Sequence, residues 1–318
     1  MRILVAGATG AVGRPLAAQL VAAGHAVVGL TRSAAKTATI RALGAEAVVA
    51  DALDAKALCD AVVAARPDAI VHEMTDLTGA SDLRDFDRSF AGSNRLRTLG
   101  TDNLLAAARE GGVERLVAQS YCGWPYARVG GAVKSETDPL DPNPPKQLHR
   151  SLEAIRHLEG VVTGSSRPAG IVLRYGSFYG RDTGLFEGSF VDQIRRRRVP
   201  LIGGGNGWWS FVQIDDAARA TVLALEHGRP GEIYNIVDDE PAPVRQWLPA
   251  LAELLGARPP RRVPAWLARL LAGEHLVAMM TAARAGSNAK ARRELAWRPE
   301  PASWRQGFAD IVGQRRAA

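Results

Sequence analysis

The chain has 318 residues, of which 47% are hydrophobic and 23% are charged, as in an ordinary globular protein with one large domain or a domain plus a smaller lobe. The formal net charge of +7 invites a nucleic-acid interpretation, but the cations are interspersed with acidic residues along most of the chain, so we expect no nucleic-acid partner. Two distant cysteines, Cys59 and Cys122, provide neither a disulfide framework nor a metal-ligand spacing; we expect a reducing, cytoplasmic location and no metal site.

Short β-branched runs alternate with longer Ala- and Leu-rich runs through the first half of the chain. The expected strands are residues 3–6, 26–30, 47–49, 69–72, 116–119 and 170–174, and the expected helices are 12–23, 34–43, 55–65 and 95–109. Such alternation predicts an α/β fold, a doubly wound parallel sheet of the Rossmann type with helices on both faces.

The second half of the chain is less regular. Four prolines mark residues 135–145 as a loop, and no simple alternation follows Tyr175. We therefore expect a dinucleotide-binding domain at 1–174, rejoined by about 211–237, and a smaller substrate-binding lobe at 175–318. Arg195–Arg198 ends a predicted helix, where cations complement the helix dipole, which favours a solvated helix end over a phosphate-binding patch.

Membrane association is not expected from the sequence. The chain opens directly on a strand, so we expect no signal peptide. The most apolar late stretch, 263–283, is interrupted by Arg269, Glu274 and His275, which is too polar for a span of about 20 apolar residues. We interpret that stretch as one or two core helices.

The clearest motif is the glycine-rich turn that joins the first strand to the first helix. It reads Gly7-Ala8-Thr9-Gly10-Ala11-Val12-Gly13. Gly7 permits the tight turn, Gly10 allows close backbone approach to a pyrophosphate, and Gly13 allows close packing of helix and strand. The free N–H groups and the positive dipole of the helix N-terminus attract the anion. Because the motif lies between a strand and a helix, it predicts a nicotinamide dinucleotide site.

The end of the second strand indicates which dinucleotide is bound. NAD(H) sites usually have a carboxylate there for the ribose hydroxyls, but this chain reads Leu30-Thr31-Arg32-Ser33. Arg32 and Ser33 are suited to bind a 2′-phosphate, so we expect NADP(H) as the cofactor and keep NAD(H) as the alternative. The alternative without a function for Arg32 is a solvated side chain at the end of the strand. Asp51 and Ala52, after the third strand, are expected near the adenine.

Several segments together resemble the extended short-chain dehydrogenase/reductase superfamily, of the NAD-dependent epimerase/dehydratase type. They are the glycine spacing, residues 71–75, 100–109, 209–216 and 232–236, and residues 291–297 with Pro299. The resemblance places His72 and Glu73 at the cofactor edge of the fourth strand. It implies a core role for His72, whereas Glu73 is either a base near the nicotinamide or a packing residue. It also makes a homodimer, formed through two helices, a reasonable expectation.

The resemblance implies a catalytic centre made of a Ser or Thr, a Tyr and a Lys. Ser120 matches the serine, but the Tyr-x-x-x-Lys pair is missing, and Leu148 and Leu152 stand where it is expected. No tyrosine occurs from Ala127 to Arg174, so a shift in register does not restore the pair. Arg97 stands where the family has a helix asparagine.

Three residues are candidates to replace the lost proton donor. Tyr121 and Tyr126 follow the serine strand, at the edge where ligands bind in such sheets, although pocket lining or packing is the simpler role for both. His149 lies beside the vacated position and has a suitable pKa, but it also fits an exposed helix residue.

Three functions remain open at this stage. The first is an NADP(H)-dependent oxidoreductase acting on a carbonyl or hydroxyl group of a small metabolite. Trp208 and Trp209, near the expected cleft, favour an apolar or aromatic one, although they also fit packing between the lobes. The second is a redox-neutral epimerase, dehydratase or lyase with a tightly held nicotinamide, and the third is a non-catalytic NADP(H)-binding sensor.

Overall fold

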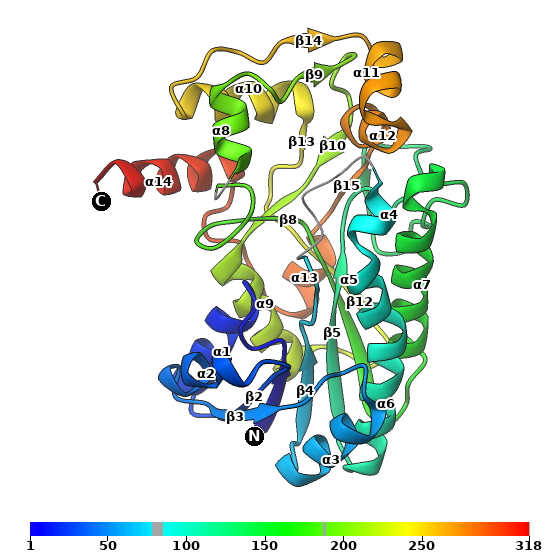
Figure 1. Ribbon diagram of the computed structural model, residues 1–318, viewed down its shortest axis with the longest axis vertical. Coiled ribbons are helices and arrows are strands. Elements are labelled where there is room, and N and C mark those ends of the chain that lie inside the picture. The colour runs from blue at the N-terminus through cyan, green and yellow to red at the C-terminus, as the bar shows by residue number, and fades with distance from the viewer. Residues whose placement is uncertain (78–84, 187–188, 318) are drawn as a thin grey trace.

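The computed structural model describes residues 1–77, 85–186 and 189–317 (Figure 1). Its centre is a seven-stranded parallel sheet of order β12-β7-β5-β4-β1-β2-β3. The strands are β1 Arg2–Ala6, β2 Ala26–Thr31, β3 Glu46–Val49, β4 Ala69–His72, β5 Arg115–Tyr121, β7 Ala169–Tyr175 and β12 Ile233–Ile236. The strands expected in the first half are confirmed, with ends that differ by at most two residues.

Helices cover both faces of the sheet, as the alternation of strand and helix predicted. One face packs against α1 Gly13–Ala22 and α9 Ile214–His227, and the other against α3 Ala55–Ala65, α6 Thr101–Glu110 and α7 His149–Thr163. Successive strand residues feed the two cores in turn, as in β5, where Leu116 and Ala118 face α3, α6 and α7 while Val117 faces the other side.

Two of the expected helices are divided in the structure. Residues 34–43 form a 3₁₀ turn, η1 Ala34–Lys36, followed by α2 Thr37–Ala42. Residues 95–109 belong to α5 Ala91–Arg95, a π-helical turn η2 Leu96–Gly100, and α6. A short helix, α4 Phe86–Ser89, precedes α5, and η3 Lys146–Leu148 precedes α7.

A smaller lobe lies beyond the end of the sheet where the strands finish (Figure 1). Its helices are α8 Ser189–Arg195, α10 Val244–Leu254, α11 Ala265–Ala272, α12 Glu274–Thr281 and α14 Trp304–Ala317, and its core contains Phe211, Trp247, Trp304 and Phe308. Short strand pairs tie it together and to the main sheet: β8 Ser177–Tyr179 with β11 Phe211–Gln213, β9 Leu201–Ile202 with β14 Arg262–Val263, β10 Trp208–Trp209 with β13 Ala242–Pro243, and β6 Val133–Lys134 with β15 Ala285–Gly286. Helix α13 Ala289–Glu294 returns to the main sheet beside β12.

The apolar stretch 263–283 forms two helices, α11 and α12, as expected, but the expected core position is wrong for one side of α11. Trp266, Leu270 and Leu271 are 63%, 78% and 64% exposed, because only the opposite side of this helix packs on the lobe core. Within the described residues, no helix is long and apolar enough to cross a membrane.

Candidate active site

The glycine turn has the shape of an anion cradle. Gly7 has a φ of +95°, and a Cβ at this position would lie 2.7 Å from the carbonyl oxygen of Glu73. A Cβ at Gly13 would lie 2.1 Å from the carbonyl oxygen of Gly7, so only glycine fits at position 13 in this turn. Among the described residues no side chain caps the N-terminus of α1, which leaves its N–H groups available to a ligand.

A cavity of about 440 Å³ opens beside this turn, at the carboxyl ends of β1, β2, β3 and β4. The residues expected at the cofactor that line it are Gly7, Thr9, Gly10, Ala11, Arg32, Ser33, Asp51, Ala52 and Glu73. Val12, Gly13 and His72 lie behind this wall as buried residues. The cradle and the cavity fit a dinucleotide, whose diphosphate would lie at the start of α1.

The part of the cavity at the end of β2 is basic. Arg32 is exposed and makes a 3.3 Å ion pair with Asp76, and Ser33 lies next to it. Lys36, on η1, lines the same wall, and the sequence analysis did not single it out. Its position three residues after Ser33, in the turn that follows β2, was the available signal. Asp51 is oriented by its own loop, because its Oδ1 accepts a 2.9 Å hydrogen bond from the N–H of Leu53.

His72 is a buried structural residue at the end of β4. Its Nδ1 accepts a hydrogen bond from the N–H of Met74 at 3.2 Å, and its Nε2 lies 3.1 Å from the hydroxyl of Thr101. Burial lowers the pKa of His72 to about 4, so the ring is neutral. These contacts join β4 to α6 behind the cofactor cavity.

Glu73 is a buried carboxyl group in the wall of the cavity beside the glycine turn. It is 5% exposed, lines the cavity, and has one carboxyl oxygen, Oε2, without a partner among the described residues. Burial raises its pKa to about 8. The Tyr175 hydroxyl lies 3.1 Å from Glu73 Oε1 and 2.6 Å from Thr221 Oγ1, while Thr221 donates to the carbonyl of Ala217. Because Thr221 donates its proton to Ala217, Tyr175 must donate to Thr221, and its single proton is then not available to Glu73. A protonated Glu73 can donate to the Tyr175 oxygen instead, so the protonated form satisfies these contacts better than a carboxylate.

Ser120 belongs to a buried hydrogen-bond network and, unlike the next residue Tyr121, lines no part of the aromatic pocket described below. Its hydroxyl donates to Glu159 of α7 at 2.7 Å, and Glu159 accepts two hydrogen bonds from Arg174 at 2.7 and 2.6 Å. Arg174 also donates to the hydroxyl of Tyr126, which donates to Asn235 at 2.7 Å. Tyr126 is fully buried, and burial raises the pKa of its hydroxyl well above the usual range. Two of the four expected catalytic residues, Ser120 and Tyr126, thus lie in one structural network.

Tyr121, the residue after Ser120, points to the other side of β5 and lines an aromatic pocket. Its hydroxyl lies 3.1 Å from Ser177 Oγ, and burial raises its pKa. The pocket, about 30 Å³ in the free protein, is lined by Tyr121, Cys122, Gly123, Trp124, Ser177, Trp208, Trp209, Ser210, Met279 and Ala283. The period of two along β5 was the sequence signal for this division, since Ala118 and Ser120 share one face and Tyr121 the other.

Leu148 lies beside this aromatic pocket. It lines a second small cavity together with Trp124, Met279 and Ala283, which also line the aromatic pocket. Leu148 is 2% exposed and Leu152, one turn further, is fully buried. Apolar side chains therefore occupy both positions where the sequence comparison expected a tyrosine and a lysine.

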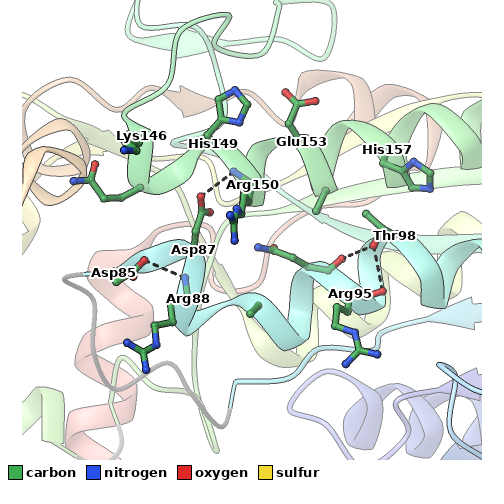
Figure 2. Close-up of a pocket in the computed structure, with 14 residues that line it drawn as sticks. Asp85, Asp87, Arg88, Arg95, Thr98, Lys146, His149, Arg150, Glu153 and His157 are labelled. Carbon is green, nitrogen blue, oxygen red and sulfur yellow. Dashed lines mark hydrogen bonds between the residues drawn. The ribbon is translucent and has the colours of Figure 1, made fainter.

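His149 lies in a different place, an open groove of about 1200 Å³ between α4, α5 and α7. Figure 2 shows His149, Glu153 and His157 along α7, opposite Arg88 and Arg95. Asp87 anchors the start of α7 through the backbone N–H groups of Arg150 and Ser151. The structure thus separates the four expected catalytic residues: only Tyr121 lines the aromatic pocket.

Comparison with known proteins identifies the family to which this fold belongs. The profile of the NAD dependent epimerase/dehydratase family matches residues 3–237, from β1 through β12. The chain belongs to this family. As a member of the epimerase/dehydratase family it is an enzyme dependent on NAD(P), since the named relatives are reductases, epimerases and dehydratases.

Two curated relatives of this family member are reductases. The 3-diazoavenalumate denitrifying reductase of a Streptomyces species is 44% identical over 97% of this chain and 99% of its own length. The 4-hydroxy-2-methyl-3-oxo-4-farnesyl-3,4-dihydroquinoline-1-oxide ketoreductase of Stigmatella aurantiaca is 28% identical over 81% of this chain and 74% of its own.

Solved structures of the epimerase/dehydratase family share the whole fold. The dTDP-glucose 4,6-dehydratase of Streptomyces venezuelae, with NAD and TYD bound, has a TM-score of 0.77 and 26% identity over 100% of this chain and 97% of its own. The UDP-glucose 4-epimerase of Thermus thermophilus, in complex with NAD, has a TM-score of 0.75 and 25% identity, and each chain covers the other completely.

Proposed function

We propose that this protein is an NADP(H)-dependent reductase that reduces an aromatic, strongly electrophilic substrate without a dedicated proton donor. The observation that carries the proposal is the apolar wall at Leu148, beside the aromatic pocket, where the family resemblance calls for a tyrosine. The 44% identity to a named reductase over nearly the whole of both chains supports reduction over a redox-neutral reaction.

The residues of this chain are suited to hold the phosphorylated dinucleotide. The glycine turn and the start of α1 bind the diphosphate, and Arg32, Ser33 and Lys36 bind a 2′-phosphate at the end of β2. Glu73, kept neutral by burial, places no negative charge beside the diphosphate. A reduced nicotinamide, when bound, supplies a hydride.

Reduction of an ordinary ketone produces an alkoxide, which needs a proton, and a positioned general acid contributes roughly 10²- to 10⁴-fold to such a rate. Leu148 and Leu152 have no proton to give, and the hydroxyls of Ser120 and Tyr126 are held in the buried network. The hydroxyls that line the aromatic pocket belong to Tyr121, Ser177 and Ser210, and that of Tyr121 is the phenolic one. Its contact with Ser177 orients it, and we assign it to positioning the substrate among Trp124, Trp208 and Trp209.

A diazo compound is a substrate class that fits this arrangement. The name of the Streptomyces relative describes a reductase that removes nitrogen from a 3-diazo substrate. Replacement of an aryl diazonium group by hydrogen consumes one hydride and releases N₂. The electron pair of the hydride forms the new C–H bond, the electron pair of the C–N bond leaves on nitrogen, and no proton is taken up. The aromatic lining suits the planar ring of such a substrate, and the pocket, about 30 Å³ in this structure, must widen to admit the ring.

Isotope transfer tests this function. The purified protein is incubated with NADPH carrying deuterium at C4 and with a benzenediazonium carboxylate, and the product and N₂ are followed by mass spectrometry. We expect one deuterium in the arene from the cofactor and none from D₂O. The control is Gly13→Ala, whose Cβ would collide with Gly7, and it should not exceed the rate without enzyme. Solvent-derived hydrogen in the product, or equal rates for the variant, would refute the proposal.

The other two functions predict different outcomes of the same experiment. Release of N₂ without consumption of NADPH, with a phenol in place of the arene, would indicate a redox-neutral enzyme. Tight cofactor binding without turnover of any substrate would indicate a sensor. The homodimer expected from the family stays a prediction, which light scattering of the purified protein measures directly.

A further inference from the structure

The outer side of α11 is the most prominent apolar surface of the lobe. Trp266, Leu270 and Leu271 follow each other at a spacing of four and then one residue, which places them within one broad side of the helix. All three are more than 60% exposed, whereas Ala268 on the opposite side is 4% exposed and belongs to the lobe core. The helix thus has its contacts within the fold, and its outer side is additional apolar surface.

A group of arginines lies at the end of α8 and in the segment that leads through β14 to α11, at the same end of the lobe as this helix. We call it the arginine rim: Arg195, Arg196, Arg198, Arg258, Arg261 and Arg262, all of them exposed. The two runs lie side by side because Arg197 donates to the carbonyl of Pro259 at 3.0 Å and β14 pairs with β9. In Figure 1, β9, β14 and α11 lie together at the outer end of the lobe.

Few acidic side chains pair with the arginine rim. Within the described residues, Arg195 reaches Asp192 at 4.0 Å, and the other five rim arginines make no ion pair. Residues 195–198 do lie at the solvated end of α8, as expected from the sequence. The sequence did not indicate that they lie beside the exposed arginines of residues 258–262. Six guanidinium groups and three exposed apolar side chains at the same end of the lobe fit a partner that is both anionic and apolar.

We propose that the outer end of the lobe binds an anionic lipid surface. Trp266, Leu270 and Leu271 enter the boundary between headgroups and acyl chains, and the arginine rim pairs with lipid phosphates. This proposal departs from the sequence-based expectation of no membrane partner, which rested on the lack of a spanning segment; a helix that lies on the surface needs none. A nucleic acid would satisfy the arginines but leave the two leucines in water. A second copy packed on this end would bring arginines against arginines.

This surface contact is independent of the proposed reduction, although α12 connects the two regions. Met279 of α12 lines the aromatic pocket, and its carbonyl accepts a 3.0 Å hydrogen bond from the indole of Trp209. Helix α12 follows α11 directly in the chain, separated only by Gly273. Attachment through α11 would therefore bring this wall of the pocket close to the lipid surface.

Vesicle co-sedimentation of the full chain tests the proposal. Vesicles of phosphatidylcholine alone are compared with vesicles that contain phosphatidylglycerol in equal part. We expect binding to the anionic vesicles that weakens with salt, and at least about tenfold weaker binding to the neutral ones. Failure to bind anionic vesicles at low salt would overturn the proposal.

Two variants test the two halves of the surface separately. The triple change Trp266→Ser, Leu270→Ser, Leu271→Ser and the double change Arg261→Gln, Arg262→Gln are each expected to weaken binding by about tenfold or more. Val129→Ser is the matched control, since Val129 is 69% exposed and belongs neither to α11 nor to the arginine rim, and its binding should not change. Unchanged NADPH binding shows that each variant is folded.

The other possible partners give distinct results. If the triple variant binds anionic vesicles as well as the unchanged protein, the apolar contact is wrong. If the protein binds duplex DNA but not vesicles, the rim recognises nucleic acid. If light scattering shows that the triple variant turns a dimer into a monomer, the surface is an interface between copies. Each of these outcomes overturns the lipid proposal.

Discussion

Replacement of Ser120 by Ala separates a structural role from a catalytic one. The change removes one hydrogen bond to the buried carboxylate of Glu159, while both bonds from Arg174 remain. A hydrogen bond to a charged group contributes about 1.5–3 kcal/mol, and the two remaining donors keep the carboxylate satisfied. We therefore expect the free energy of unfolding to fall by about 1–2 kcal/mol. Turnover should stay within about threefold, because the lost hydroxyl does not line the aromatic pocket.

Urea unfolding and steady-state kinetics of the same preparations measure the two effects. Ser177→Ala is the matched comparison, since this serine touches the hydroxyl of Tyr121 inside the pocket. For that variant we expect stability to change by less than about 1 kcal/mol and kcat/KM to fall by about tenfold. A serine that polarises a reacting carbonyl would instead cost about 10²- to 10³-fold in kcat. Such a loss in Ser120→Ala, with unchanged stability, would refute the structural assignment.

Three further predictions concern the cofactor cavity. Arg32→Gln should weaken NADPH binding by about tenfold or more and leave NADH binding unchanged, as measured by fluorescence titration; equal losses for both would exclude a 2′-phosphate contact. Gly13→Ala should weaken both cofactors by roughly tenfold to a hundredfold, because its Cβ would overlap the carbonyl oxygen of Gly7, and unchanged affinity would contradict the cradle. The native pKa of Glu73, about 8, lies above its unfolded value, so its contribution to stability is complete below about pH 4.5 and is lost as the pH rises through 8. Glu73→Gln should therefore be more stable than the unchanged protein at pH 8 by a few kcal/mol, since each pKa unit is worth about 1.4 kcal/mol. Above pH 8 the ionised Glu73 should weaken NADPH binding, and the variant should lose this weakening. If stability and NADPH binding depend on pH in the same way in both proteins, a protonated Glu73 is excluded.

The sheet was predictable from the sequence because its strands are buried on both faces. Residues 69–72 and 116–119 are short runs between helical patterns, apolar except for His72 and Gln119 at their ends, and they form β4 and β5 as expected. The lobe was less predictable, because its short strands β8 to β11 owe their existence to pairing with distant segments. The exposed side of α11 was also missed, since a helix that is apolar all round looks like a core helix in sequence.

The cavity beside the glycine turn was largely predictable from the sequence, whereas the aromatic pocket was not. Gly7, Gly10 and Arg32 have positions fixed by a local strand–turn–helix unit, and they line the cavity as expected. Ser120 and Tyr126 were proposed from their distance along the chain, but their orientation depends on β7, α7 and β12, which contact them from far away in sequence. No local pattern carries that information.

The position of β12 in the sheet affects how the chain is made. β7 ends at Tyr175, yet its outer neighbour, Ile233–Ile236, is synthesised only after the first segments of the lobe. Until then the growing chain presents β7 as an unpaired edge, and Tyr126 and Arg174 lack Asn235 as the last member of their network. Open edges of this kind promote association between chains. Part of the lobe is thus encoded between two neighbouring strands of the sheet, β7 and β12. A fragment that stops before β12 would retain the glycine turn but tend to aggregate.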